Sequence, residues 1–316
     1  VELNPATEIQ PLIGSKEGIL HVTLAFVNPG EQVLVPNPGY PTYTSLSKIL
    51  GAEVVNYNLK EEDGWMPDFD ELEKMDLSRV KLMWTNYPNM PTGANATPEL
   101  YKRLVEFARR KNIVIVNDNP YSFILNDKPI SILSVPGAKE CCIEFNSMSK
   151  SHNMPGWRIG MLASNAEFVQ WILKVKSNID SGMFRAMQLA AAKALEADST
   201  WYEGNNVNYR NRRHLAGEIM KTLGCTYDEK QVGMFRRCRR TDRESAAGST
   251  RLHHSGIYFR KQRSEIHPHL SLLQRRQAGR SAGTNQINNE ITTKRIRSIW
   301  NSNQSYCRVW KINARW

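Results

Sequence analysis

Hydrophobic and polar positions alternate between two spacings along the first 165 residues. Short runs rich in Val and Ile, such as "EQVLVPNP" and "IVIVNDNPY", predict buried strands, whereas longer stretches with apolar residues three and four positions apart predict helices. In "TPELYKRLVEFARRKN" a Thr cap and an early Pro mark the start of such a helix. The expected strands are residues 31–38, 52–59, 80–88, 113–121, 141–150 and 158–164, and the expected helices are residues 14–28, 42–51, 97–112, 166–178, 184–197 and 199–224.

Strands that alternate with helices of this length predict an α/β fold, in which a mainly parallel, doubly wound sheet carries helices on both faces. Such sheets bind ligands at the carboxyl ends of their strands. The polar residues that follow the expected strands are therefore the candidates for a functional site.

Several of these candidates have both a structural and a functional interpretation. Ser15 and Lys16 open the first helix, where free backbone N–H groups are either capped or hold an anion. Tyr40 lies in "PNPGYPTY", which is a turn that also presents an aromatic face. Asp118 ends the strand "IVIVND", where a buried carboxylate is costly unless it is paired, and Tyr121 follows three residues later.

The stretch "NSMSKSHNMPGWRIG" carries the most specific pattern. It places Ser147, Ser149 and Lys150 at the end of an expected strand and supplies Arg158, between two glycines, further on. A lysine in this setting is either part of a polar turn or a nucleophilic amine with phosphate ligands around it.

Taken in order, these motifs resemble the class I and II aminotransferases of fold type I, which bind pyridoxal 5′-phosphate. The S-x-S-K…G-x-R-x-G signature stands here between Ser147 and Gly160, and "PGYPTY", "PTG" and D-x-x-Y precede it in the family's order. The similarity covers nearly all of residues 1–235 and is nearest to the branch that includes LL-diaminopimelate and aspartate-type aminotransferases. It implies transfer of an amino group from an amino acid to a 2-oxo acid.

The resemblance also implies a role for each site residue. Lys150 forms a Schiff base with the cofactor aldehyde and then moves the substrate's α-proton, Asp118 pairs with the pyridinium nitrogen, and Tyr121 donates to the ring hydroxylate. Tyr40 stacks on the ring. The residues implied in cofactor binding are Ser15, Lys16, Tyr40, Asn89, Asp118, Tyr121, Ser147, Lys150 and Arg158, of which Ser15, Lys16, Ser147 and Arg158 hold the phosphate; no metal is implied.

One position departs from the family pattern. The residue before P-T-G is normally an asparagine that bonds the ring hydroxyl, and here it is Met90. A methionine cannot donate this hydrogen bond. Either Asn89 replaces it with a shifted backbone, or Tyr121 alone serves the hydroxyl.

The net charge of +11 belongs to one part of the chain. Residues 1–235 carry 24 Lys and Arg against 27 Asp and Glu, whereas residues 236–316 carry 18 against 4 and lack hydrophobic periodicity. With the resemblance, this predicts a cofactor-binding large domain at residues 1–200, an interdomain helix and the start of a small domain at 201–235, and a poorly ordered basic tail at 236–316.

Two hypotheses explain the tail. If the codons of residues 256–275 are read from their second base, a permitted translation is "GFIFGSNGARYIRISLCCKD", which contains a strand like the one that carries the family's substrate-carboxylate arginine. We therefore expect a frameshift near residue 236, a missing natural N-terminus, and little transaminase activity from the chain as written. The competing interpretation is an RNA- or DNA-binding arm, because Arg clusters with aromatic residues bind phosphates and bases.

Other features bear on broad classes of protein. The sequence has no run of about 18 apolar residues that would predict a membrane span. Its five cysteines form no CxxC pair, which favours free thiols and a cytoplasmic location. A lyase or decarboxylase on the same fold stays open beside the aminotransferase, as does a catalytically silent protein. The resemblance implies a homodimer with amino acid and 2-oxo acid substrates.

Overall fold

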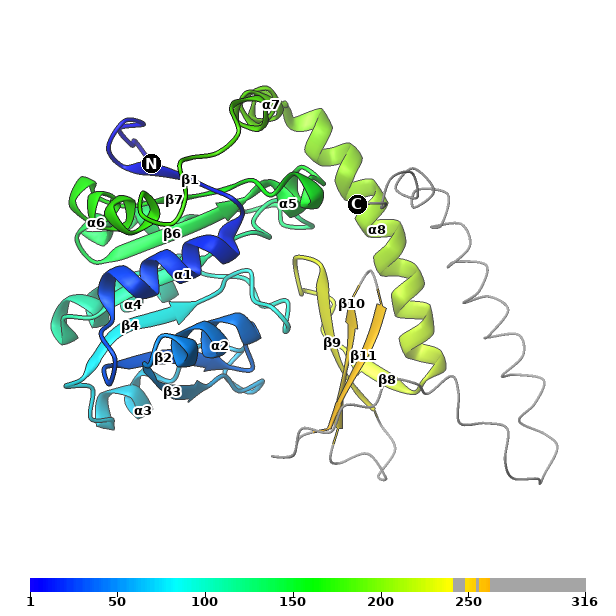
Figure 1. Ribbon diagram of the computed structural model, residues 1–316. Coiled ribbons are helices and arrows are strands. Elements are labelled where there is room, and N and C mark those ends of the chain that lie inside the picture. The colour runs from blue at the N-terminus through cyan, green and yellow to red at the C-terminus, as the bar shows by residue number, and fades with distance from the viewer. Residues whose placement is uncertain (241–247, 254–255, 262–316) are drawn as a thin grey trace, which may run out of the picture. The chain divides into compact units, whose positions relative to one another are not determined.

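A seven-stranded mixed sheet forms the largest part of the protein (Figure 1). This computed structural model describes residues 1–240, 248–253 and 256–261 of the chain. The strands are β1 (Ile9–Leu12), β2 (Gln32–Asn37), β3 (Glu53–Asn58), β4 (Val80–Thr85), β5 (Val114–Asp118), β6 (Cys142–Ser147) and β7 (Gly160–Ala163), in the spatial order β1-β7-β6-β5-β4-β2-β3. β2 to β6 pair in parallel, whereas β7 pairs antiparallel with both β6 and β1. The mainly parallel sheet is as the sequence predicts.

Helices cover both faces of this sheet. They are α1 (Ser15–Phe26), α2 (Pro41–Ile49), α3 (Phe69–Lys74), α4 (Pro98–Lys111), α5 (Met148–Ser151), α6 (Ala166–Lys176), α7 (Arg185–Leu195) and α8 (Ser199–Thr222), with 3₁₀ turns at Ile132–Ser134, Ala138–Glu140 and Pro155–Trp157. Each of the six strands predicted from the sequence is present, and β1 and α3 are additional elements that the sequence reading did not predict.

The alternation of side chains along each strand builds two hydrophobic cores. Val33 and Val35 of β2 face α1, α2 and α6, while Leu34 between them faces α4. In β4, Trp84 belongs to the core of Val33 and Val35, and Met83 belongs to the core of Leu34. Because successive side chains of a strand point to opposite faces, central strands rich in Val, Ile and Leu bury both faces at once.

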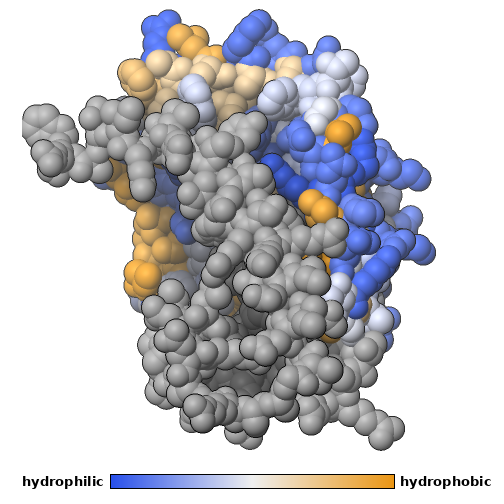
Figure 2. Space-filling view, turned by 90° about the vertical axis from the view of Figure 1, so that its right-hand side faces the viewer, coloured by the Kyte–Doolittle hydropathy of each residue, from blue (hydrophilic) through white to orange (hydrophobic). Residues whose placement is uncertain are grey.

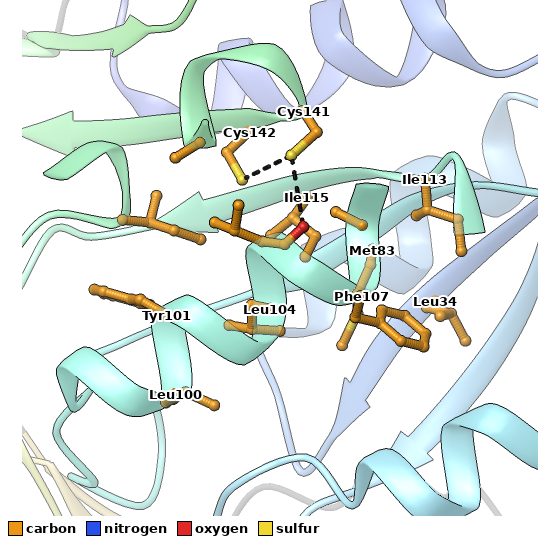
Figure 3. Close-up of a cluster of buried hydrophobic side chains, with 14 of the residues drawn as sticks. Leu34, Met83, Leu100, Tyr101, Leu104, Phe107, Ile113, Ile115, Cys141 and Cys142 are labelled. Atoms are coloured by element: carbon orange, nitrogen blue, oxygen red, sulfur yellow. Dashed lines mark hydrogen bonds between the residues drawn. The ribbon is translucent and has the colours of Figure 1, made fainter. Parts of the chain in front are cut away.

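The core under α4 shows how sequence pattern becomes packing. Leu100, Leu104 and Phe107 recur at helical spacing and meet Met83 and Ile115 of the sheet (Figure 3). The helix begins where the Thr97 side chain accepts a hydrogen bond from the Leu100 backbone N–H at 3.1 Å. It ends at Asn112, which adopts a left-handed conformation with φ 52°.

A second, four-stranded antiparallel sheet follows α8 in the chain. It consists of β8 (Cys225–Tyr227), β9 (Phe235–Arg240), β10 (Gly248–His253) and β11 (Gly256–Lys261), in the order β11-β10-β9-β8. Apart from Phe235, the strands β9, β10 and β11 fall within the first part of the predicted basic tail. Their backbone groups pair along regular ladders, such as Thr250 opposite Phe259, and a ladder satisfies backbone hydrogen bonds without helical periodicity. The rest of the predicted tail lies outside the described residues.

Contacts from the region after residue 198 reach the loop that follows β5. Asn206 of α8 accepts a hydrogen bond from the Leu125 backbone N–H and donates one to the Phe123 carbonyl, at 2.9 and 3.2 Å. The Gly233 N–H donates to the carbonyl of Ile124 at 2.8 Å. In the ranges that the structure describes, no helix combines the length and apolar character needed to cross a membrane.

Candidate active site

A cleft of about 590 Å³ lies at the carboxyl ends of the central parallel strands. Asp118 is the last residue of β5, Ser147 is the last residue of β6, and Asn86 directly follows β4. Neighbouring parallel strands end at the same edge of a sheet, so these residues meet although they are far apart in sequence. Eight of the residues predicted to bind a cofactor line this cleft: Ser15, Lys16, Tyr40, Asp118, Tyr121, Ser147, Lys150 and Arg158.

Asn89 does not line the cleft, which differs from the sequence-based prediction. Its side chain is buried, and its Oδ1 accepts hydrogen bonds from the backbone N–H and the hydroxyl of Thr92 at 3.2 and 2.8 Å. This local turn uses the amide oxygen, and Asn89 is not among the residues that line the cleft. Met90 and Asn86 line the cleft in its place.

The Asp118 carboxyl group is buried but only half paired. It is 5% exposed, and its Oδ2 accepts a hydrogen bond from the Tyr43 hydroxyl at 2.8 Å. Its Oδ1 makes no hydrogen bond within the described residues. Burial raises the pKa of Asp118 to about 6, and the hydrogen bond from Tyr43 limits the rise. The group is therefore ionised at neutral pH and has one oxygen available.

Lys150 reaches the cleft from the short helix α5. The helix begins at Ser147, whose hydroxyl accepts a hydrogen bond from the Ser149 backbone N–H at 3.2 Å. Burial, and then the positive charge of Arg158, lower the pKa of Lys150. Both effects favour the neutral amine, which is the nucleophilic form.

The start of α1 and Arg158 form a corner of the cleft that could hold an anion. Gly14 precedes the helix with φ 78° and no side-chain cap, so the first N–H groups of α1 remain available. The Ser15 hydroxyl is buried and makes no hydrogen bond to any described residue. Arg158 packs so closely that a Cβ atom on Gly14 would overlap its Nη2 atom. Gly160 also allows a close approach, since a Cβ there would lie 3.1 Å from the Ser15 backbone nitrogen.

Aromatic side chains form the walls of the cleft. The Tyr40 ring meets Tyr43 edge to face, with centroids 5.5 Å apart. Tyr121 meets Phe235 in the same way at 5.4 Å. Burial, together with the charge of Asp118, raises the pKa of Tyr121, so its hydroxyl stays protonated and can donate a hydrogen bond.

Comparison with known proteins identifies the family. The sequence model of aminotransferase class I and II matches residues 1–263. The chain belongs to this aminotransferase family. Among curated aminotransferases, the LL-diaminopimelate aminotransferase of Dehalococcoides mccartyi strain 195 is 45% identical over 237 residues, and that of Aquifex aeolicus is 46% identical over 226 residues.

These alignments cover part of each aminotransferase. They include 74% and 71% of this chain but 61% and 58% of the two relatives, so the chain spans about 60% of their length. Solved aminotransferase-family structures agree with the fold. Apo-BacF from Bacillus subtilis superimposes with a TM-score of 0.72 at 34% identity, over 75% of this chain and 64% of that one. A probable N-succinyldiaminopimelate aminotransferase from Thermus thermophilus gives 0.72 at 28% identity, over 77% and 66%.

Two cleft residues of this aminotransferase-family chain were not assigned a role from the sequence. Asn86 donates through Nδ2 to the Asp118 carbonyl at 2.5 Å and accepts from the Met90 N–H at 2.7 Å. Asn86 directly follows β4, and β4 pairs with β5, the strand that ends in Asp118. This position at the end of a strand could have marked Asn86 as a candidate site residue from the sequence. Tyr43 lies three residues after Tyr40, which places both side chains on one side of α2.

A partly buried ionic cluster joins the first turn of α1 to the segment after α6. Lys176 Nζ lies 2.7 Å from Glu17 Oε1 and 2.5 Å from Asp180 Oδ2. His21 lies beside them, and ligand atoms of Glu17, His21 and Asp180 fall within 4.8 Å of one another, a spacing that a metal ion could use. The Lys176 ammonium already neutralises the carboxylates. Burial opposes this charge, but the hydrogen bonds to Asp180 and Glu17 prevail and raise the pKa of Lys176.

Proposed function

We propose that this chain carries the site of a pyridoxal 5′-phosphate-dependent aminotransferase that uses Lys150, and that the chain as written has little turnover. The observation that supports this most strongly is the convergence of Lys150, Asp118 and Arg158 on one cleft. Three unlike groups, namely an amine, a buried acid and a guanidinium at a helix N-terminus, match the three polar regions of this cofactor. The curated relatives are named aminotransferases, which favours amino transfer over elimination or decarboxylation.

The polar atoms that lack partners support the fit of this cofactor. Asp118 Oδ1 and Ser15 Oγ are both buried, and neither makes a hydrogen bond within the part of the chain that the structure describes. Buried polar atoms are costly to leave unpaired, so a ligand that pairs both would recover that free energy. A ring nitrogen carrying a proton suits Asp118, and a phosphate suits Ser15 with the N–H groups of α1.

Each wall residue then has a defined task. With the cofactor bound, Asp118 would hold a proton on the ring nitrogen by accepting a hydrogen bond from it, and Tyr121 would donate to the ring hydroxyl oxygen. Tyr40 covers one face of the ring. Ser15, Lys16, Ser147 and Arg158 bind the phosphate. When bound, the cofactor supplies an aldehyde that bonds to amines and a ring that withdraws electrons from the substrate's Cα.

Lys150 has two tasks in this proposal. Its neutral Nζ would be the amine that holds the cofactor through its aldehyde, and it would take up the proton released from the substrate's Cα. Both tasks need an unprotonated amine, and burial and Arg158 shift the pKa of Lys150 in that direction. Pairing with a carboxylate would shift it the other way.

The substrate is proposed from the relatives. At 45% and 46% identity to two LL-diaminopimelate aminotransferases, an amino acid with a second charged end, such as LL-diaminopimelate, is the first donor to test. The acceptor is a 2-oxo acid such as 2-oxoglutarate. A donor panel that also includes aspartate, alanine and an aromatic amino acid separates this proposal from its neighbours in the family.

The decisive experiment is spectroscopic. Purified protein with added pyridoxal 5′-phosphate should develop a visible absorbance band, and borohydride reduction should fix the pyridoxyl group to Lys150 in a peptide mass map. Lys150→Ala should lose both signals, whereas Lys128→Ala, at an exposed lysine, should keep them. Labelling of another lysine in the wild type, or an unchanged band in Lys150→Ala, would refute the proposal.

A homodimer is proposed as the functional unit. Several large hydrophobic side chains on and beside α7 are exposed, among them Phe184 at 71% and Leu189 at 60%. At the top of the view in Figure 2, hydrophobic residues in shades of orange lie between hydrophilic ones. Exposed apolar patches of this kind mark protein contact sites. Analytical ultracentrifugation should find a dimer that Phe184→Asp converts to monomer, and a monomeric wild type would contradict the proposal.

A further inference from the structure

The backbone around Asp118 is fixed from several directions. Asn86 Nδ2 donates to the Asp118 carbonyl at 2.5 Å. The side chains of Asn117 and Asn119, on the opposite face of the strand, both donate to the buried Glu144 carboxylate, at 3.4 and 3.3 Å. With the main chain held in this way, the remaining freedom of Asp118 is rotation of its side chain.

Tyr43 restricts that rotation. Its hydroxyl donates to Asp118 Oδ2 at 2.8 Å, which leaves Oδ1 as the oxygen without a partner among the described residues. The ring of Tyr43 is completely buried and is stacked on Trp84, with centroids 4.9 Å apart and an interplanar angle of 5°. A ring packed between Trp84 and Tyr40 cannot move its hydroxyl far, so the hydrogen bond has a fixed origin.

We propose that Tyr43 is a positioning residue that orients the Asp118 carboxylate toward the ring nitrogen of the bound cofactor. The inference rests on the proposed function, because it presumes that a nitrogen-containing ring occupies the cleft. Tyr43 acts through Asp118. One carboxylate oxygen is held by the protein and the other is presented to the ligand, which is a preorganised geometry.

The hydroxyl also affects the charge of Asp118. A hydrogen bond to an ionised carboxylate favours the ionised form, and that form makes the stronger, charge-assisted bond with a protonated ring nitrogen. The titratable groups that share the cleft with Asp118 are Lys16, Tyr40, Tyr43, Tyr121, Lys150 and Arg158. Of these, Tyr43 makes a direct hydrogen bond to the carboxylate. Losing it should leave Asp118 both less oriented and less ionised.

Two ligands and two substitutions test this inference on the full chain. The dissociation constants of pyridoxal 5′-phosphate and of its 1-deaza analogue, which has carbon in place of the ring nitrogen, are measured by fluorescence titration. Tyr43→Phe should weaken binding of pyridoxal 5′-phosphate roughly tenfold and leave the deaza analogue within about twofold. In an Asp118→Asn background, Tyr43→Phe should add less than about twofold, because the two residues act as one unit.

Tyr57→Phe is the matched control. Tyr57 is also a buried tyrosine whose hydroxyl bonds within the protein, to the Trp84 carbonyl at 2.6 Å, and it does not line the cleft in the described structure. Removal of the Tyr57 hydroxyl should leave both dissociation constants unchanged. In the test variant, Tyr43→Phe, the aromatic ring is kept, and circular dichroism melting checks that this variant is folded.

Each outcome decides a different question. An equal loss for both ligands would show that Tyr43 only maintains the shape of the cleft, and unchanged binding of pyridoxal 5′-phosphate would show that Asp118 needs no support; either result overturns the inference while leaving the proposed function intact. A wild-type chain that binds neither ligand would overturn the proposed function and this inference with it.

Discussion

At the scale of single residues, Gly14 illustrates how backbone conformation serves the site. Its φ of 78° is unfavourable for residues with a Cβ atom, and its lack of a side chain makes room for Arg158. The combination lets the guanidinium approach the first N–H groups of α1. A larger residue would therefore be expected to damage both stability and anion binding.

We predict that Gly14→Ala lowers the free energy of unfolding by about 1–2 kcal/mol and weakens binding of pyridoxal 5′-phosphate at least about tenfold. Gly64→Ala is the control, since Gly64 has a φ of 64° with open space around it. It should show a similar loss of stability in urea denaturation and no change in cofactor binding. Equal effects on binding would contradict the role assigned to the Gly14 and Arg158 contact.

Asp118 predicts a pH dependence with a definite sign. Its pKa is raised from 3.8 to about 6 in the folded protein, so the native state binds more protons than the unfolded state between these values. The contribution to stability is therefore present at low pH and is lost as pH rises toward 6. The loss is about 3 kcal/mol, at about 1.4 kcal/mol for each unit of pKa.

This effect can be isolated with Asp118→Asn, which does not titrate. In the absence of cofactor, the variant should be more stable than wild type at pH 7 by up to about 3 kcal/mol, and the difference should shrink toward pH 4. Urea denaturation of both proteins at several pH values measures it. A difference that does not change with pH would mean that Asp118 titrates normally.

At the scale of secondary-structure elements, the ionic cluster of Lys176 with Glu17 and Asp180 joins α1 to the segment after α6. It predicts that the loss of stability depends on which lysine is replaced. Lys176→Met removes a buried cation from two partly buried carboxylates and should cost about 3 kcal/mol of folding free energy. Lys139→Met breaks the more exposed pair of Lys139 with Glu8, at 3.0 Å, and should cost less than about 1 kcal/mol. Denaturation of both variants tests this, and similar losses would rule out a special contribution of the ionic cluster.

The elements also show what the sequence could predict. The six predicted strands and the capped helix α4 depend on local patterns, and all of them are present. The antiparallel direction of β7 and the position of β1 beside it depend on pairing between segments about 150 residues apart, which no local pattern records. The short helix α3 has too few residues to give a clear period.

The functional site shows the same difference between features set by local sequence and features set by distant contacts. Lys150, Asp118 and Arg158 were predicted because strand ends and motif spacing are visible along the chain. The partnership of Tyr43 with Asp118 joins residues 75 positions apart, and it became visible only when the strands were placed side by side. Asn89 was assigned from its closeness to P-T-G, but the turn directs its amide to Thr92 instead.

At the scale of the whole molecule, the coding sequence after residue 235 is testable. We propose a one-base shift near residue 236, because the second-base translation contains the "YIRIS" strand, and curated relatives align over 237 and 226 residues. Sequencing the coding DNA should find codons for residues 256–275 that yield this string. Codons that cannot yield it would leave the written frame, with its family match to residue 263, as the correct one.

The cleft draws its lining from Ser15 near one end of the described chain to Phe235 near the other. An occupant held by so many separate segments would oppose unfolding of all of them, and at a concentration one hundred times its dissociation constant it would add about 2.7 kcal/mol of stability. With the proposed cofactor as that occupant, the lifetime of the polypeptide in a cell should follow the supply of vitamin B6. Starved of it, the protein would open more often and become a better substrate for proteases.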